Sequence, residues 1–415
     1  MKCSDHLGLR RDGDAYCDAE QYAVKLPTSI AFFLQASIIL LFLAGSSAPT
    51  PLYTVYQASW GFSPITVTVI FGCYAVAVLM ALLVAGSVSD HVGRRPVLLA
   101  TTLMQAGVMV LFIEADSVAM LIVARVGQGL ATGLAASAVG AGMLDLDRER
   151  GAVANAVAPM LGTATGAILS GVLVDYAPSP TTLVYAVLGA LYVMQFVGVV
   201  FMRETVATRP GAWASLRPRI HMPARLRVAA LVAAPAVAAA WAFAGFYASL
   251  GPVVVRTLAD SPSHLVGGLS LAVLVGTGAT AVFLLRTRGV RFLMIFGTLS
   301  LVVGVALTVL AIGLTSLPVF FLGEAVAGCG FGCAFQGAIR SVVPFAEPHE
   351  RAGVLSVVYI VAYLAMGVPA VVGGIRLVGT GDVLGTATEY GLAVIVFALL
   401  SFLGLVLARS SRAER

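Results

Sequence analysis

Twelve long apolar segments, separated by short stretches of charges, prolines and glycines, dominate the pattern along this chain. Each segment has close to or more than the ~20 residues that a tilted helix needs to cross a hydrocarbon layer. Backbone N–H groups find no water in such a layer, so helices are expected. The segments cover residues 29–53, 64–85, 96–113, 118–144, 151–174, 181–202, 228–255, 263–285, 291–313, 317–343, 352–375 and 387–408. The pattern therefore predicts an all-α membrane protein with twelve transmembrane helices.

Composition excludes most other classes of protein. Of the 415 residues, 59% are hydrophobic and only 11% are charged, and the mean hydropathy is +0.97. A water-soluble domain carries about 25% charged residues, because its surface faces water. A soluble enzyme is therefore excluded, as are a disordered chain and a disulfide-rich secreted domain.

Positive charge is distributed unequally between the two sides of the predicted membrane. Of the 25 Lys and Arg residues, 22 lie in the termini, in the loops on their side, or at the helix ends beside those loops. Only Arg256 and Arg376 lie in loops of the other side. The positive-inside rule then places both termini in the cytosol. The excess of Lys and Arg on the cytosolic side explains the net charge of +5, so no nucleic-acid partner is expected.

The two halves of the sequence are related to each other. A shift of 199 residues places Arg125 on Glu324 and Gly129 on Gly328. We expect two parallel six-helix repeats, an architecture in which one half rocks against the other. We expect no signal peptide in residues 1–27, because they contain no apolar core. The expected units are a cytosolic tail at 1–28, a bundle at 29–202, a cytosolic linker at 203–227, a bundle at 228–408 and a cytosolic tail at 409–415.

Metal and cofactor chemistry find little support in the sequence. The five cysteines follow no disulfide or zinc spacing, and the histidines fall in predicted tails or loops or, for His264, at the first turn of a segment beside a loop. Cys329 and Cys333 share a helix face, where small packing side chains are the better interpretation than a metal site. The sequence contains no G-x-x-x-x-G-K-[ST] phosphate-binding loop. We expect no cofactor and no metal, and a proton gradient as the energy source.

The sharpest local motif lies in the loop between the second and third segments. Its key residues are Gly86, Asp90, Gly93, Arg94 and Arg95. Gly86 is expected to let two helices approach, Gly93 to permit a turn, and Asp90 to sit at a helix N-terminus or pair with arginine. An ordinary positive-inside turn would explain the arginines only. The motif resembles the signature loop of the major facilitator superfamily, which implies a transporter fold and a gating role for this loop.

The resemblance extends over essentially the whole chain after residue 28. In the fourth segment, Arg125 with Gln128 and Gly129 is similar to the buried-arginine motif of the superfamily's drug/proton antiporters. The fifth segment has similar glycine spacing, but Ala167 and Ser170 replace a proline and a glycine of the antiporter motif. These departures weaken the case for efflux, and glycine spacing is also a general means of packing membrane helices.

Two ionisable residues lie well inside apolar segments. Arg125 and Glu324 have equal depths in the fourth and tenth segments, which line the central cavity in the superfamily that the chain resembles. Charge at such depth is costly, so it usually faces a cavity and finds a partner. We predict that Glu324 couples transport to protons and that Arg125 is the partner whose distance tunes its proton affinity. The alternatives are a static buried pair, a pair that closes the extracytoplasmic side, and coupling by Glu114 or Asp175.

Other polar and aromatic side chains at depth are candidates for the substrate cavity. A glutamine in a membrane helix could contact substrate or, equally, form a hydrogen bond between helices. The candidates are Gln35, Gln128, Trp241, Phe246, Tyr247 and Gln336.

These features favour a proton-coupled secondary transporter of small organic solutes, working by alternating access and most consistent with efflux. An uptake permease for a sugar or organic acid is the alternative, and an intramembrane enzyme would need a buried catalytic cluster that the sequence lacks. The expected partners are a small-molecule substrate, protons and the lipid bilayer, with the chain as a monomer in a prokaryotic cytoplasmic membrane. Neutralising Asp90 is expected to impair transport more than membrane insertion.

Overall fold

The computed structural model describes residues 26–218, 220–347 and 350–413, so parts of the two predicted tails lie outside the described residues. The described residues of the first half form eight helices. They are α2 (Thr28–Ser47), α3 (Pro49–Trp60), α4 (Pro64–Ala85), α5 (Ser89–Val92), α6 (Arg94–Ile113), α7 (Val118–Leu146), α8 (Arg148–Tyr176) and α9 (Pro180–Val200).

A linker with two short helices joins the first half to the second. The linker helices are α10 (Ala212–Ser215) and the 3-10 turn η1 (Ala224–Leu226). The second half then contains α11 (Arg227–Ser249), α12 (Gly251–Ala259), α13 (His264–Leu284), α14 (Val290–Gly313), α15 (Leu317–Val342), the 3-10 turn η2 (Val343–Phe345), α16 (Arg351–Thr380) and α17 (Val383–Ala413).

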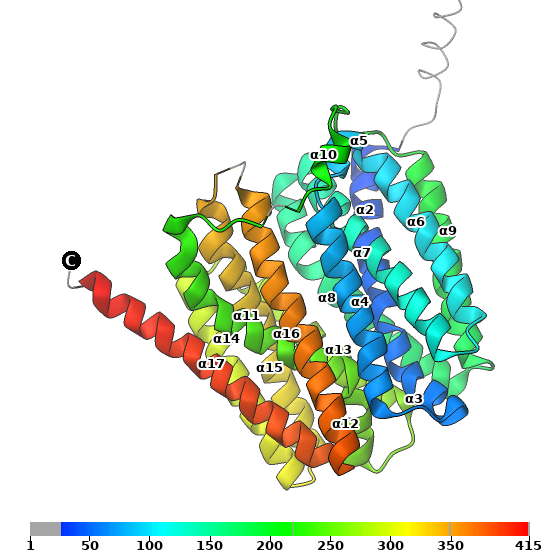
Figure 1. The fold of residues 1–415 in the computed structure, drawn as a ribbon, viewed down its shortest axis with the longest axis vertical. Helices are drawn as coiled ribbons and strands as arrows, with labels where there is room; N and C mark the ends of the chain where they lie inside the picture. Colours follow the sequence, from blue (N-terminus) through cyan, green and yellow to red (C-terminus); the bar gives the residue numbers. More distant parts are fainter. Residues whose placement is uncertain (1–25, 219, 348–349, 414–415) are drawn as a thin grey trace, which may run out of the picture.

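Twelve spans in the described residues are long and apolar enough to cross a membrane, and those residues contain no strand. Figure 1 shows two groups of steeply inclined helices, one from each half of the chain. The predicted fold class is therefore confirmed. We call the end of the bundle with α5 and α10 the linker end, and the opposite end, with α3 and α12, the far end.

The first and seventh spans are broken at the same relative position in the two halves. The first span does not end at residue 53, as the pattern predicted, but continues through α3 to Trp60. Pro49 lies in the first turn of α3 and Pro252 in the first turn of α12. Proline has no N–H group to donate, so it is tolerated where a new helix starts and disfavoured inside one. Each span therefore bends near the far end of its half.

Each half has its own apolar core. One cluster lies wholly within residues 31–202, while the other is formed by second-half residues together with Ala164 and Ala167 of α8. The two halves meet along two seams, where α4 packs against α16 and α8 packs against α13. Figure 1 shows α4 and α16 side by side toward the far end and diverging toward the linker end.

Candidate functional site

Close contact between the halves runs from the far end to the middle of the bundle. On the α8–α13 seam, a Cβ atom at Gly171 would lie 2.8 Å from Leu265 Cα. On the α4–α16 seam, Gly374 lies against Thr68, and Gly367 lies against Ala75 farther toward the middle. Glycine allows this approach because no side chain separates the two backbones.

The hydrogen bonds found between described residues of the two halves all lie at the far end. Thr50 donates to the carbonyl of Ala248 (3.1 Å), and Arg256 donates to the Thr54 hydroxyl (3.1 Å). The carboxylate of Asp175 accepts further bonds from the start of α13. The far end is therefore held shut in this structure.

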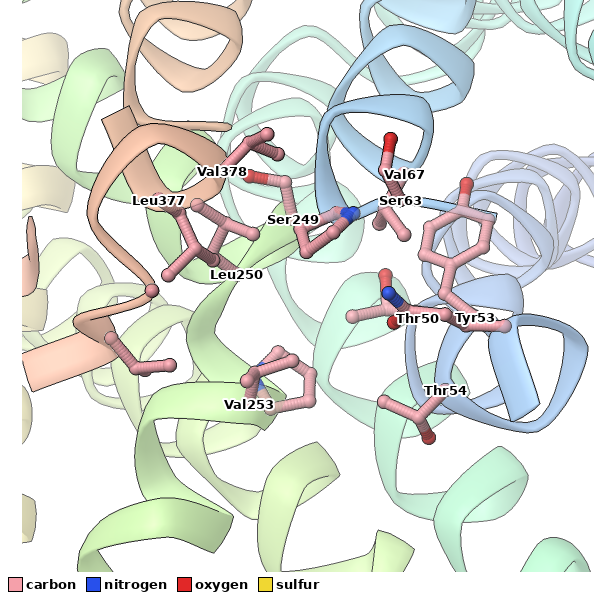
Figure 2. Close-up of a pocket in the computed structure, with 15 residues that line it drawn as sticks. Thr50, Tyr53, Thr54, Ser63, Val67, Ser249, Leu250, Val253, Leu377 and Val378 are labelled. Atoms are coloured by element: carbon pink, nitrogen blue, oxygen red, sulfur yellow. The ribbon is translucent and has the colours of Figure 1, made fainter. Parts of the chain in front are cut away.

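A cavity of about 390 Å³ lies beside these contacts. Figure 2 shows Thr50, Tyr53 and Thr54 of the first half facing Ser249, Leu250 and Val253 of the second. Among the described residues, no charged side chain lines the cavity, and the polar side chains there carry hydroxyls and one amide. The remaining lining residues are Gln57, Ser63, Pro64, Val67, Pro252, Leu377, Val378, Gly381 and Val383.

Arg125 is fully buried inside the first half. Its Nε donates to the Tyr53 hydroxyl (2.8 Å), and its Nη1 donates to the Ser46 carbonyl (2.8 Å) and to the Gln128 side chain (2.5 Å). The guanidinium also lies over the ring of Tyr74, 4.9 Å from its centroid. These contacts place the cation between α2, α3, α4 and α7 and connect it, through Tyr53, to the wall of the cavity.

Glu324 is fully buried inside the second half. One carboxylate oxygen accepts a hydrogen bond from Ser270 of α13, and the other has no hydrogen-bond partner among the described residues. The expected ion pair between Arg125 and Glu324 is not present in this structure. The reason is that Arg125 is already held by Tyr53 and first-half groups, while Glu324 points toward α13 within its own half.

Four of the six predicted cavity residues are buried within one half instead of facing the other. Gln35 donates to the Met202 sulfur (3.7 Å), and Gln128 donates to the Gly45 carbonyl (2.9 Å). Phe246 and Tyr247 are buried in the core of the second half. The Gln128 bond joins α7 to α2, whereas Met202 follows the end of α9 and Oε1 of Gln35 has no hydrogen-bond partner among the described residues. Gln336, at the linker end of α15, lies beside Arg340, with 3.1 Å between the side-chain amide and Nε.

Trp241 does lie where the two halves meet. Its ring is surrounded by Phe331, Phe335 and Tyr363, with centroid separations of 6.0, 5.1 and 5.2 Å. It also packs against a cluster that includes Phe71 of the first half. The indole Nε1–H has no hydrogen-bond partner among the described residues. This group of five rings is called the aromatic cluster below.

The signature loop forms a compact ion-pair network at the linker end. Arg94 is buried and contacts Asp90 (2.5 Å), the Ser89 hydroxyl (2.7 Å) and Asp145 (3.3 Å). Asp90 thus pairs with arginine, one of its two expected roles, and makes no contact with the second half among the described residues. Gly93 has a φ of +100°, as a turn glycine should.

Two details of this loop differ from what its sequence predicts. Gly86 does not mediate a contact between helices, because the atoms nearest to its absent Cβ belong to Leu82 of the preceding turn. The N-terminus of α6 is capped by Glu204, which accepts from the backbone N–H groups of Arg94 (2.8 Å) and Arg95 (3.0 Å). Sequence reasoning missed Glu204. Its position as the first acid after the sixth segment, on the side rich in arginine, was the available signal.

Comparisons with known proteins agree with this architecture. The sequence model of the Major Facilitator Superfamily matches residues 36–369. The fold is similar to the crystal structure of a mutant of the nucleoside transporter NupG, with a TM-score of 0.68, 12% identity, and coverage of 92% of this chain and 99% of that one. It is also similar to the human organic anion transporter MFSD10 (TETRAN), with a TM-score of 0.66, 18% identity, and coverage of 92% and 100%. No curated protein gives a significant match.

Proposed function

This chain belongs to the major facilitator superfamily and is a multi-pass membrane transporter of small solutes, not an enzyme; on that premise, we propose that it couples export of an organic solute to proton entry. The solute and the protons would be carried by alternating access, with the two halves rocking about a central site. The single observation that carries the coupling proposal is the environment of Glu324.

Glu324 has the properties of a proton carrier in a membrane domain. It is fully buried, it contacts the Ser270 hydroxyl, and one of its oxygens is unpartnered. No cation of the described structure forms an ion pair with it, so the Ser270 hydroxyl is the one group found there that stabilises the charged carboxylate. A buried acid without a cationic partner favours the neutral form, whereas access to water favours the charged form. Opening and closing a water path to Glu324 would therefore load and release a proton.

Arg125 has a separate role in this proposal. Its bonds to Ser46, Gln128 and Tyr53 hold α2, α3 and α7 together, and Tyr53 also lines the far-end cavity. Arg125 would thus position the first-half wall of the transport path. A buried guanidinium left without these acceptors would destabilise the half, so the network is expected to persist through the transport cycle.

The aromatic cluster is the proposed substrate surface. Rings from α4, α11, α15 and α16 meet there, and Trp241 offers a free indole N–H group. Such a surface suits a moderately lipophilic solute with a ring and a hydrogen-bond acceptor. Uptake of a neutral solute such as a sugar is the second candidate, because the polar side chains of the far-end cavity, which lie among valine, leucine and proline residues, are hydroxyls and one amide.

The experiment uses purified protein in proteoliposomes and proceeds in two steps. First, a Trp60→Phe/Trp213→Phe variant, in which Trp241 is the only tryptophan, is titrated with a panel of aromatic compounds and sugars. Quenching of the Trp241 fluorescence shows which compounds bind and whether they are aromatic compounds or sugars. Second, uptake of that ligand is measured with and without a pH gradient for the parent, Glu324→Gln and the control Asp116→Asn, whose side chain is exposed.

Glu324→Gln is expected to abolish accumulation driven by the pH gradient while leaving exchange without a gradient within about twofold of the parent, because amide and carboxyl groups have similar size. Asp116→Asn should match the parent in both assays. Full accumulation by Glu324→Gln with unchanged pH dependence would show that another group carries the proton.

A further inference from the structure

We propose that Asp175 is the latch that holds the far end closed, by capping the N-terminus of α13 across the boundary between the two halves. The inference rests on the proposed alternating access, because a latch has a function only if that end also opens. Asp175 lies in the last turn of α8, in the first half, whereas α13 belongs to the second half.

Both oxygens of the Asp175 carboxylate are used in this contact. One accepts from the backbone N–H of His264 (2.9 Å) and lies 3.0 Å from its ring Nδ1. The other accepts from the Ser263 hydroxyl (2.6 Å) and from the backbone N–H of Leu265 (3.0 Å). The side chain of Asp175 is only 14% exposed. Four hydrogen bonds therefore cross the boundary at one side chain.

The start of α13 needs such an acceptor. The first N–H groups of a helix have no partner within the helix, and negative charge near them is stabilising. The first turn of α13 contains no acidic residue. Its N-cap, Ser263, accepts only from the N–H of Val266, at 3.4 Å. The N–H groups of His264 and Leu265 are left for Asp175, so the cap is complete only while the halves touch.

The backbone geometry explains how so short a side chain reaches across. Gly171 lies one helical turn before Asp175 on α8, and its Cα faces Leu265 without an intervening side chain. This close approach brings the end of α8 next to the first turn of α13. The latch thus depends on Gly171 for distance and on Asp175 for charge.

At the opposite end, no equivalent contact between the halves is found among the described residues. Asp90, the acid of the signature loop, is 52% exposed and pairs with Arg94 of its own loop. The other bonds that cross at the far end, Thr50 to Ala248 and Arg256 to Thr54, each use an uncharged partner. Asp175 is therefore the acid that distinguishes the closed end from the other end.

Interactions made in one conformation only shift the equilibrium toward that conformation. Removing the Asp175 charge should therefore favour opening at the far end. Charged helix caps have modest effects, so the ratio of open to closed molecules should rise by roughly 3- to 10-fold.

The test measures the distance between the halves directly. Spin labels are placed on Ser59→Cys of α3 and Thr257→Cys of α12, both exposed, in a background with the five native cysteines replaced by serine. Double electron–electron resonance then compares the parent with Asp175→Asn, Asp175→Ala and Ser263→Ala. Asp116→Asn, which removes an exposed charge at the same end of the first half, is the matched control.

The longer-distance population should grow in Asp175→Ala and Asp175→Asn, grow less in Ser263→Ala, and stay constant in Asp116→Asn. If Asp175→Ala does not fold into monodisperse protein, Asp175→Asn and Ser263→Ala carry the test, since they delete fewer atoms. If the Asp175 variants leave the distance between the two spin labels unchanged, the latch proposal is wrong. This conclusion does not depend on the transport result for Glu324→Gln. The two proposals can fail separately. If the Asp175 variants open the far end but Glu324→Gln still accumulates substrate with normal pH dependence, the proton role of Glu324 is wrong and the latch stands.

Discussion

Arg125 and Glu324 illustrate what a single residue in a membrane segment reveals. Their depth was readable from the sequence, since a charge inside an apolar run is rare and costly. Their partners were not readable, because Tyr53, Ser46 and Ser270 are ordinary residues whose hydroxyl or carbonyl groups matter only once helices are packed. Both residues are buried as predicted and stay candidates for a role in transport, but each has its own partners in the structure.

At the same scale, Asp90→Asn should reduce transport roughly fivefold or more while changing the melting temperature little. Partly exposed ion pairs contribute about 1 kcal/mol or less to stability, and Arg94 retains Asp145 and the Ser89 hydroxyl. The loss would affect the balance between conformations that the loop helps to set. Counterflow in proteoliposomes and thermal unfolding in detergent measure the two effects. Glu149→Gln, exposed on the same side, serves as control; equal rates in both variants would remove the gating role from Asp90.

Among the elements, the helices were predicted well and their ends poorly. All twelve spans match an apolar segment, because the requirement to satisfy backbone groups in lipid leaves no other choice. The first and seventh predicted segments end at residues 53 and 255, inside α3 and α12, which continue to Trp60 and Ala259. The cap of α13 by another helix has no sequence signature, because the acid lies 88 residues from the serine that it contacts.

The seam between α8 and α13 offers a steric test at the element scale. Gly171→Ala should separate the halves at the far end, because its new Cβ would lie 2.8 Å from Leu265 Cα and 3.2 Å from the His264 carbonyl oxygen. Overpacking of this kind costs ~1–3 kcal/mol in the closed state. Expression should be maintained, since alanine favours helix more than glycine does. Gly107→Ala, which meets no atom within 4 Å, is the control.

The distance between spin labels on Ser59→Cys and Thr257→Cys is measured in Gly171→Ala and in Gly107→Ala. A shift to longer distances in Gly171→Ala alone is expected. Identical distributions for the two variants would mean that the seam can adjust without opening.

For the whole molecule, the internal repeat and the signature loop were sufficient to predict two six-helix halves, and the family match over residues 36–369 agrees with them. Which end is closed was beyond sequence reasoning. Conformations of a transporter share one sequence and differ by only a few kcal/mol, so the choice depends on contacts such as those of Thr50 and Asp175.

Orientation is a property of the whole chain, and the arginine distribution predicts it. A single cysteine at Ser59, at the far end, should react with a membrane-impermeant maleimide in intact cells. A cysteine at Trp213, which is 87% exposed at the linker end, should react only after the membrane is made permeable. Both variants use the background without native cysteines. The reverse labelling pattern would contradict cytosolic placement of the linker end.

The acceptor that completes the start of α13 is contributed by a helix made much earlier in synthesis. A chain emerging from the ribosome inserts α8 before α13, so the Asp175 carboxylate is already in place when the His264 and Leu265 N–H groups arrive. The first turn of α13 is therefore expected to be fully capped only when the first half is present. Expressed as two separate polypeptides, the second should remain protease-sensitive near its second span until the first is supplied.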